Sequence, residues 1–437
     1  MTLTTFAPVF AGALLAATAT AATAQTPAPQ RLELGVLHRA AVDTDPRLRE
    51  LTLRPAQSEL RVKNIETSWY PSISVEGQLQ SQSDVPTPPT LVPGGTPLFL
   101  PPKNTYDASV HVEQRIVDST VAAQLSVEKA QLAEDQARVR TALFALRQEV
   151  NEAFFTAALL QERAGALAAT ITDLEARLSE TATRVREGAA LPSDAAAIEA
   201  SLLQRRQDAA ELRVDRRTAL SRLGLLTGRT IGEADVLVLP DLGSDVVKER
   251  AAAAARARPE YDQFARTRDR LAQQQAAADA QVRPRVSAYG RAGLGYPGLN
   301  VIGSQPEFYA LGGVQLQWRA WTWGASTREH DAYGIQQQIV LAEEESFTKS
   351  LARTSDGDLA AIDRLESTMS LDDRIVSLRE DIDRTTQARF REGVATSSES
   401  VDRSTDLLQA RFARAGHVVE LAQARARYLT TLGLEVR

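Results

Sequence analysis

The longest hydrophobic pattern in the chain runs from Ser119 to Glu187. Apolar residues recur there at alternating steps of four and three: Val139, Leu143, Leu146, Val150, Phe154 and Ala157, then Leu167, Ile171, Leu174 and Leu178. The stretch contains no proline, and as one helix at ~1.5 Å per residue it would span on the order of 100 Å. An apolar stripe that returns every seven residues predicts coiled-coil packing against other helices. Alone, this pattern also fits a cytoskeletal or adaptor coiled coil, so the flanking segments decide the interpretation.

Four shorter segments alternate between apolar and polar residues, which predicts β-strands with one apolar face. The apolar positions are Ile73, Val75, Gly77 and Leu79; Tyr106, Ala108, Val110 and Val112; Val286, Ala288, Gly290 and Ala292; and Phe308, Ala310, Gly312, Val314 and Leu316. Each segment runs about 10–12 residues, close to the ~9–11 residues that a tilted strand needs to cross a bilayer.

The second half of the chain repeats the first. Asp45-Pro46-Arg47 matches Arg258-Pro259-Glu260, Tyr70-Pro71-Ser72 matches Arg283-Pro284-Arg285, and Gly77 matches Gly290, all at an offset of 213 residues. Further on, Arg184 to Gly188 matches Arg389 to Gly393, and Gly228 matches Gly433, at an offset of 205. The offset shortens because the loop at 83–104 is longer than its counterpart at 296–307. Each repeat therefore predicts helix, strand, loop, strand, long helix, tight turn and helix.

The first 24 residues carry no charged side chain, centre on an apolar run at 10–17 and end in Ala22-Thr23-Ala24. This small-x-small ending predicts a secretory signal peptide cleaved before Gln25. A membrane anchor is the alternative, but the apolar run is too short to span a bilayer. No other segment approaches about 18 consecutive apolar residues. Any membrane span of the exported chain is therefore expected to be β.

Aromatic residues mark the ends of the predicted strands: Trp69, Tyr70, Tyr106, Trp318, Trp321 and Trp323. Such positions predict an aromatic girdle at a lipid interface. The loops between paired strands are long and rich in Pro and Gly, as on the external side of membrane barrels; a soluble sandwich is the alternative. Four strands cannot close a barrel, because ~8 is the practical minimum in lipid. An open edge in hydrocarbon leaves backbone amides unpaired, so several chains are expected to share one barrel.

Each long helix is followed by a glycine, Gly188 or Gly393, and then by a tight turn and a returning helix. Pro192 falls at the first position of one returning helix, where its fixed φ is suitable. In the other repeat, Thr396 and Glu399 predict a capping box. Both turns are expected to be tips of antiparallel helical hairpins, about 100 Å from the strands.

Acidic residues follow both tips. Glu399 and Asp402 lie three residues apart and share one helix face, and Asp194 is the counterpart of Glu399 in the first repeat. One interpretation is that these acids simply favour the positive end of a helix dipole. The other is an acidic ring in which symmetry copies converge.

Composition narrows the possible partners. The chain has no cysteine, which excludes disulfides, thiolate chemistry and a lipidated N-terminal cysteine. A net charge of −6 over 437 residues argues against nucleic acid as a partner, since nucleic acid requires basic patches. The 5% aromatic and 43% hydrophobic residues fit a helix-rich protein with thin cores.

No catalytic constellation is found. His38, His111, His330 and His417 fall in separate segments without metal-binding spacing. The glycines of 290–295 are similar to a phosphate loop, but they lie within a predicted strand and do not open a helix. We therefore expect no enzymatic activity, no cofactor and no metal site.

Together these residues resemble the outer-membrane efflux protein (TolC) family, over about Leu32 to Gly433. The resemblance rests on the duplicated order of x-Pro helix start, strand entry after an aromatic or basic residue and Pro, strand hairpin, and Arg-x-x-x-Gly tip. It implies an α+β membrane protein and a homotrimer. Long antiparallel helices form a periplasmic coiled-coil tunnel, and four strands per chain contribute to a shared twelve-stranded barrel embedded in outer-membrane lipid.

The resemblance further implies a passive exit duct for efflux or type I secretion, coupled through a periplasmic adaptor to an inner-membrane transporter. Glu399 and Asp402 fall where the family often narrows the tunnel entrance, together with Asp194. The tips around Gly188 and Gly393, with Arg184 and Arg389, fall where adaptors dock. At positions where the resemblance implies a tyrosine and an arginine that hold the entrance shut, this chain has Phe390 and Ala395.

An alternative is a periplasmic coiled-coil adaptor that does not enter the membrane. An adaptor would show one helical hairpin flanked by β-rich domains, whereas this sequence predicts two hairpins with a strand pair in each half. The segments expected are a signal peptide (1–24), a first periplasmic helix region (25–68), a first β-hairpin (69–118), a long helix with tip turn and return helix (119–228), an equatorial linker (229–249), a helix (250–282), a second β-hairpin (283–324) and a second long helix, tip and return helix (325–437).

Overall fold

One helix carries most of the length of the molecule. α3 spans Ser119–Arg186, 68 residues, which confirms the helix predicted from the seven-residue repeat. It begins where the Asp118 side chain accepts a hydrogen bond from the Thr120 amide at 3.0 Å. This cap serves an amide that has no partner within the helix.

The computed structural model describes residues 29–86, 100–243, 247, 257–299 and 305–436. The predicted signal peptide, most of the predicted loop at 83–104 and the start of the helix predicted at 250–282 lie outside these residues. The other elements are β1 (Arg31–Glu33), α1 (Leu34–Thr44), the 3-10 helices η1 (Pro46–Arg49) and η2 (Thr67–Trp69), α2 (Glu50–Glu66), β2 (Ser72–Ser81), β3 (Asn104–Val117), α4 (Pro192–Thr227), β4 (Val236–Val238), α6 (Pro259–Ala280), β5 (Arg285–Tyr296), β6 (Glu307–Gln317), α7 (Ala325–Arg391) and α8 (Ser397–Thr431).

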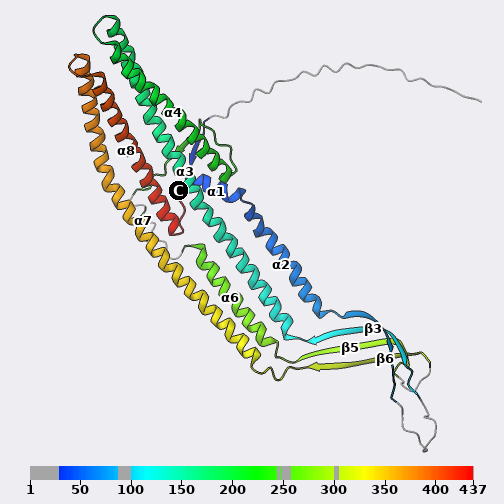
Figure 1. Ribbon diagram of the computed structural model, residues 1–437. Coiled ribbons are helices and arrows are strands. Elements are labelled where there is room, and N and C mark those ends of the chain that lie inside the picture. Colours follow the sequence, from blue (N-terminus) through cyan, green and yellow to red (C-terminus); the bar gives the residue numbers. More distant parts are fainter. Residues whose placement is uncertain (1–28, 87–99, 244–246, 248–256, 300–304, 437) are drawn as a thin grey trace, which may run out of the picture.

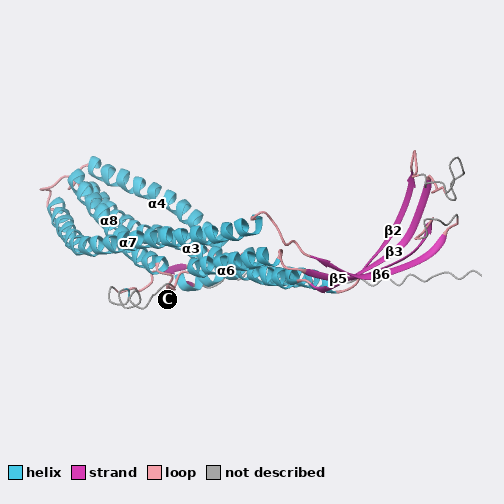
Figure 2. Ribbon diagram, turned by 90° about the horizontal axis from the view of Figure 1, so that it is seen from below, coloured by secondary structure: helices cyan, strands magenta, loops and turns pink. Residues whose placement is uncertain are grey.

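The helices and the long strands occupy opposite ends of the molecule (Figures 1 and 2). α3 with α4, and α7 with α8, form two antiparallel hairpins whose tips lie at the end away from the strands (Figure 1). Each half of the chain thus contributes one helical hairpin and one strand pair. This arrangement differs from the single hairpin flanked by β-rich domains that the adaptor alternative requires.

The four long strands form one antiparallel sheet in the order β2-β3-β5-β6. Each predicted hairpin pairs its own two strands, and the two hairpins join through β3 and β5. β2 and β6 are the outer strands, so among the described residues each has one backbone edge without a strand partner. A separate pair, β1 and β4, is parallel and lies against the helices.

The main hydrophobic core lies midway along the helices. It joins α1, α3, α4, α7 and α8 with β1 and β4. Phe154 and Phe155 are almost fully buried there and meet edge to face at 5.2 Å. Smaller clusters surround Val139 further toward the sheet and Leu174 near the tips. The apolar stripe of α3 is therefore divided among several thin cores, as the composition predicts.

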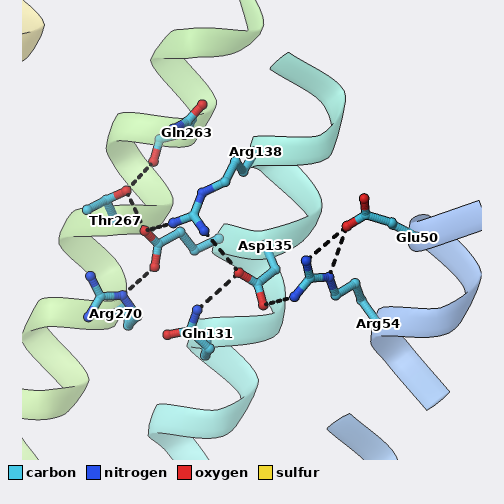
Figure 3. A network of polar contacts seen from close by, with 9 residues as sticks. Glu50, Arg54, Gln131, Asp135, Arg138, Gln263, Thr267 and Arg270 are labelled. Carbon is cyan, nitrogen blue, oxygen red and sulfur yellow. Dashed lines mark hydrogen bonds and ion pairs between the residues drawn. The ribbon is translucent and has the colours of Figure 1, made fainter. Parts of the chain in front are cut away.

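A buried carboxylate joins α3 and α6 between this core and the sheet, within the polar network drawn in Figure 3. Glu134 of α3 is 3% exposed. It accepts hydrogen bonds from Arg138 and from Thr267 of α6, both at 3.1 Å, and forms an ion pair with Arg270 of α6. Such pairing is needed because an isolated buried charge is costly.

The next residue extends the network to α2. Asp135 forms an ion pair with Arg54 at 3.4 Å, and Arg54 also pairs with Glu50 at 2.9 Å (Figure 3). Charged groups thereby fix the lateral order of α2, α3 and α6. In the part of the chain that the structure describes, no helix is both long enough and apolar enough to span a membrane.

Candidate functional site: a two-faced sheet and the helical tips

The strand registers bring the predicted apolar positions onto one face of the sheet. Val75 lies opposite Val110, Val110 opposite Ala292, and Ala292 opposite Ala310. The same alternation holds along all four strands, so this face carries Ile73, Leu79, Tyr106, Val112, Val286, Leu294, Phe308, Val314 and Leu316. Many of these side chains are open to solvent in the single chain, up to 87% for Leu79. An exposed apolar face of this extent is typical of a surface that meets lipid or another protein.

The other face is mostly polar and holds a bonded cluster across three strands. Asp107 of β3 accepts from Arg291 of β5 at 2.8 Å and from the Tyr309 hydroxyl of β6 at 2.6 Å. Arg291 also donates to the hydroxyl of Ser109 at 2.9 Å. The alternation along each strand predicts polar positions here but not a cluster, because the contacts depend on the register between non-adjacent segments.

The predicted interface aromatics lie at the two ends of the sheet. Trp69 and Tyr70 lie immediately before β2, and Trp318, Trp321 and Trp323 follow β6, so these five residues lie at the helix-side end. Trp321 and Trp323 are 74% and 82% exposed and meet edge to face at 5.9 Å.

Tyr106 lies toward the opposite, loop-side end of the sheet. It stacks there on Tyr296 at 5.4 Å. Tyr296 is not among the aromatic residues predicted at the strand ends, although it continues the apolar alternation of β5. The aromatic residues therefore bracket the apolar face at both ends.

The two helical tips share one backbone geometry. Gly188 and Gly393 have φ of +74° and +76°. After each glycine the next amide, of Ala189 or Val394, bonds to the carbonyl five residues earlier, at 2.7 and 2.9 Å. This is the Schellman motif, which places glycine in the left-handed conformation. The structural agreement supports the repeat at these positions.

The acidic residues predicted near the entrance have different local roles. Asp194 accepts from the Leu191 amide at 3.1 Å and so caps its own helix. The Glu399 amide bonds to Thr396 at 3.1 Å, which is half of the predicted capping box. The Glu399 carboxylate instead approaches Arg389 at 3.8 Å. Within the described residues, Asp402 is exposed and has no hydrogen-bond or ion-pair partner. In the same residues, no hydrogen bond or ion pair links Asp194 with Glu399 or Asp402.

Two arginines tie the tips of one chain together. Arg184, predicted as a docking residue, donates to the Phe390 carbonyl at 3.3 Å, and its guanidinium lies 5.7 Å from the centre of the Phe390 ring. Arg391 of the second tip pairs with Glu180 of α3 at 3.0 Å. Phe390 and Ala395 are both 8% exposed and pack with Leu174 in a small core.

A buried ion pair lies between the hairpins a few turns above the tips. Arg177 of α3 bonds to Asp383 of α7 at 2.6 and 3.2 Å and to the Ser400 hydroxyl of α8 at 3.3 Å. Burial alone would lower the pKa of the Arg177 guanidinium, but the hydrogen bonds and negative charge of Asp383 outweigh it and raise that pKa. The sequence alone does not predict this contact.

Residues 37–229 match the family model described as outer membrane efflux protein. This part of the chain, less than half of its length, is similar to that family. The matched range runs from α1 to just past the Gly228 turn, and the second repeat reproduces that turn at Gly433, where φ is again positive. The family consists of channel proteins and not of enzymes. The similarity to outer membrane efflux proteins places the strands in the cell outer membrane and the helical part in the periplasm.

Several solved outer-membrane channels share the fold. The outer-membrane channel OprN is 17% identical with a TM-score of 0.66, over 92% of this chain and 89% of that chain. VceC from Vibrio cholerae is 14% identical with a TM-score of 0.66, over 92% and 97%. The open state of MtrE from Neisseria gonorrhoeae is 17% identical with a TM-score of 0.64, over 92% and 89%. These similarities confirm the predicted fold class. No curated protein matches the chain in sequence.

Proposed function

We propose that three copies of the chain form a passive exit duct, coupled through a periplasmic adaptor to an inner-membrane transporter. Twelve strands, four from each copy, would enclose the outer segment of the duct in the membrane. The long helices would continue it as a tunnel through the periplasm. The proposal rests on the two-faced sheet, which offers lipid an apolar outside and cargo a polar inside.

The open edges of the sheet support assembly with other copies. An unpaired backbone edge in hydrocarbon costs several kcal/mol for each unsatisfied group. β2 and β6 run in opposite directions because three antiparallel pairings separate them. β6 of one copy can therefore pair antiparallel with β2 of the next, and the resemblance to the TolC family implies that three copies close the ring.

The helical part also carries an exposed apolar stripe on α7. Leu371, Ile375, Leu378 and Ile382 follow one another on α7 at steps of four, three and four, and they are 41% to 64% exposed. This spacing is that of a coiled-coil stripe, which needs a facing helix. A second copy supplies such a helix when the sheets join edge to edge.

The mass of the protein extracted from the outer membrane in detergent tests the assembly. A species of three chains, together with ion conduction after reconstitution into a planar bilayer, is the expected result. A monomer recovered from the soluble periplasm would contradict the duct.

Adaptor coupling is tested separately at the tips. Because the chain has no cysteine, one cysteine can be introduced at Ala189 or Val394, beside the exposed tip glycines. A thiol-reactive crosslinker is expected to capture the adaptor from these positions, and not from a matched cysteine at Ser81 on the loop side of the sheet. Equal capture from all three positions would contradict docking at the tips.

A further inference from the structure

On the polar face of the sheet, a tyrosine lies flat on a glycine. Tyr289 of β5 lies directly opposite Gly313 of β6. A Cβ atom added at Gly313 would meet the Tyr289 hydroxyl at 3.0 Å and two ring carbons at 3.1 and 3.2 Å. The end of the tyrosine thus rests on the backbone of β6 and does not stand away from the sheet.

A second tyrosine lies flat in the opposite direction. The Tyr309 hydroxyl of β6 reaches Asp107 of β3 at 2.6 Å, so the side chain crosses the intervening strand β5. Strands lie ~4.8 Å apart, and a side chain that bridges two such spacings must run along the sheet. Tyr309 is accordingly only 8% exposed, although it lies on an edge strand of a single chain.

Two glycines of β5 lie along this crossing, at positions where a larger residue would collide with β3. Gly293 lies opposite Tyr309 on one side and Ser109 on the other, and Gly295 lies opposite Asp107. A Cβ at Gly293 would approach both the Ala108 carbonyl oxygen and the Ser109 Cβ at 2.6 Å. No larger residue fits there without movement of the backbone.

Two charged side chains on the polar face, Arg291 and Asp107, also lie close to the sheet. Arg291 bonds to Asp107 and Ser109 at 2.8 and 2.9 Å and lies 5.9 Å from the centre of the Tyr309 ring. The charges of Arg291 and Asp107 therefore neutralise each other at the surface of the sheet. The two tyrosines, the arginine and the aspartate form one thin layer.

We propose that Gly293, Gly295 and Gly313 set the free width of the outer segment of the duct. By leaving room for long side chains to lie flat, they keep these side chains out of the path of the cargo. The inference rests on the proposed function, which makes the polar face the inner wall. In the closed ring each of these residues recurs at its own level in every copy, so one glycine substitution narrows the duct from several sides.

Gly313 offers the cleanest test. The three atoms nearest to its added Cβ all belong to the Tyr289 side chain, which can rotate away from the sheet, whereas Gly293 is closed in by backbone. The variant Gly313→Ala is therefore expected to fold and to lift Tyr289 into the duct. The double variant Gly313→Ala/Tyr289→Ala removes the displaced ring. Gly77→Ala is the matched control, because it adds a methyl group to the apolar face, where nothing lies within 4 Å.

The readout is the labelling of one introduced cysteine. Gln317→Cys places a thiol on the polar face at the helix-side end of β6, beyond the tyrosine layer for a reagent that enters from outside. The chain has no other cysteine. A bulky maleimide added to intact cells is expected to react several-fold more slowly in Gly313→Ala. The rate should return in the double variant and stay unchanged in Gly77→Ala.

The outcomes separate the inference from the proposed function. An unchanged rate in Gly313→Ala, with normal amounts of assembled protein, would overturn the role of the glycines while leaving the duct intact. If a small membrane-impermeant maleimide fails to reach Gln317→Cys in an otherwise unaltered chain, the polar face is not the inner wall. The duct proposal would then fail first.

Discussion

The guanidinium of Arg177 donates two hydrogen bonds to the carboxylate of Asp383, at 2.6 and 3.2 Å. The side chains are only 7% and 10% exposed and come from helices 206 residues apart in sequence. The pair therefore joins α3 of the first hairpin to α7 of the second just above the tips. Ser400 extends this contact to α8.

Asp383→Ala is expected to loosen the two hairpins near their tips. It removes one of the two carboxylate partners of a buried arginine. Asp173 stays 2.5 Å from the Arg177 guanidinium, so the cost is expected to lie below the ~3–5 kcal/mol of a buried charge left without any partner. Limited proteolysis or hydrogen exchange of the assembled protein should show faster opening around Arg177 and Ser400. Asp381→Asn is the control, because Asp381 is 63% exposed in its pair with Arg384 and such pairs contribute little. Equal opening in both variants would contradict the role of the buried pair.

The sequence predicts those parts of the structure that follow from the local spacing of hydrophobic residues. The seven-residue repeat predicts α3 to within a residue at each end. The period-two segments predict the apolar face, because antiparallel pairing keeps like positions together across strands. Gly188 is identified as a turn because its left-handed backbone favours glycine.

Contacts between distant segments could not be predicted in this way. Arg177 and Asp383 are two among 50 basic and 56 acidic residues, and only the relative position of two helices selects their pairing. The same holds for the Glu134 network and for the reach of Tyr309 across a strand to Asp107. The pairing of Glu399 with Arg389, in place of a complete capping box, also depends on how the tip turn aims its side chains.

His38 is expected to make stability depend on pH. Burial lowers the pKa of His38 from 6.5 to about 4, and its Nε2 lies 2.7 Å from the Asn151 amide oxygen. As pH falls below 6.5 the unfolded chain takes up a proton that the folded chain refuses until about pH 4. The stabilisation is thus complete above pH 6.5 and is lost toward pH 4, by about 1.4 kcal/mol per pH unit.

Thermal unfolding of the detergent-solubilised protein across this pH range measures the effect. His38→Gln removes the titrating group while keeping a polar side chain near Asn151, so its melting temperature should depend less steeply on pH. Parallel curves for the variant and the unaltered protein would show that His38 does not contribute.

Neutralising the acids beside the second tip is expected to change conduction. In Glu399→Gln/Asp402→Asn, cation preference should fall, because negative side chains at a pore entrance concentrate cations. Conductance should rise, because the contact between Glu399 and Arg389 across the tip turn is weakened. Single-channel recordings in planar bilayers measure both. Asp215→Asn, an exposed acid more than 20 residues from the start of α4, is the control. Unchanged conductance and selectivity would contradict an acidic entrance.

Replacing Gly188 or Gly165 with alanine is expected to change the local stability in opposite directions. Gly188 has φ +74° and Gly165 lies within the helix, and neither would bring a new Cβ within 4 Å of another group. Gly188→Ala should destabilise the tip by about 1–2 kcal/mol, because a Cβ disfavours the left-handed conformation. Gly165→Ala should stabilise α3 by about 0.5–1 kcal/mol, because alanine loses less backbone entropy in a helix. Hydrogen exchange measured at the first tip and along α3 distinguishes the two effects, and faster exchange in both variants would show that sterics rather than backbone conformation dominate.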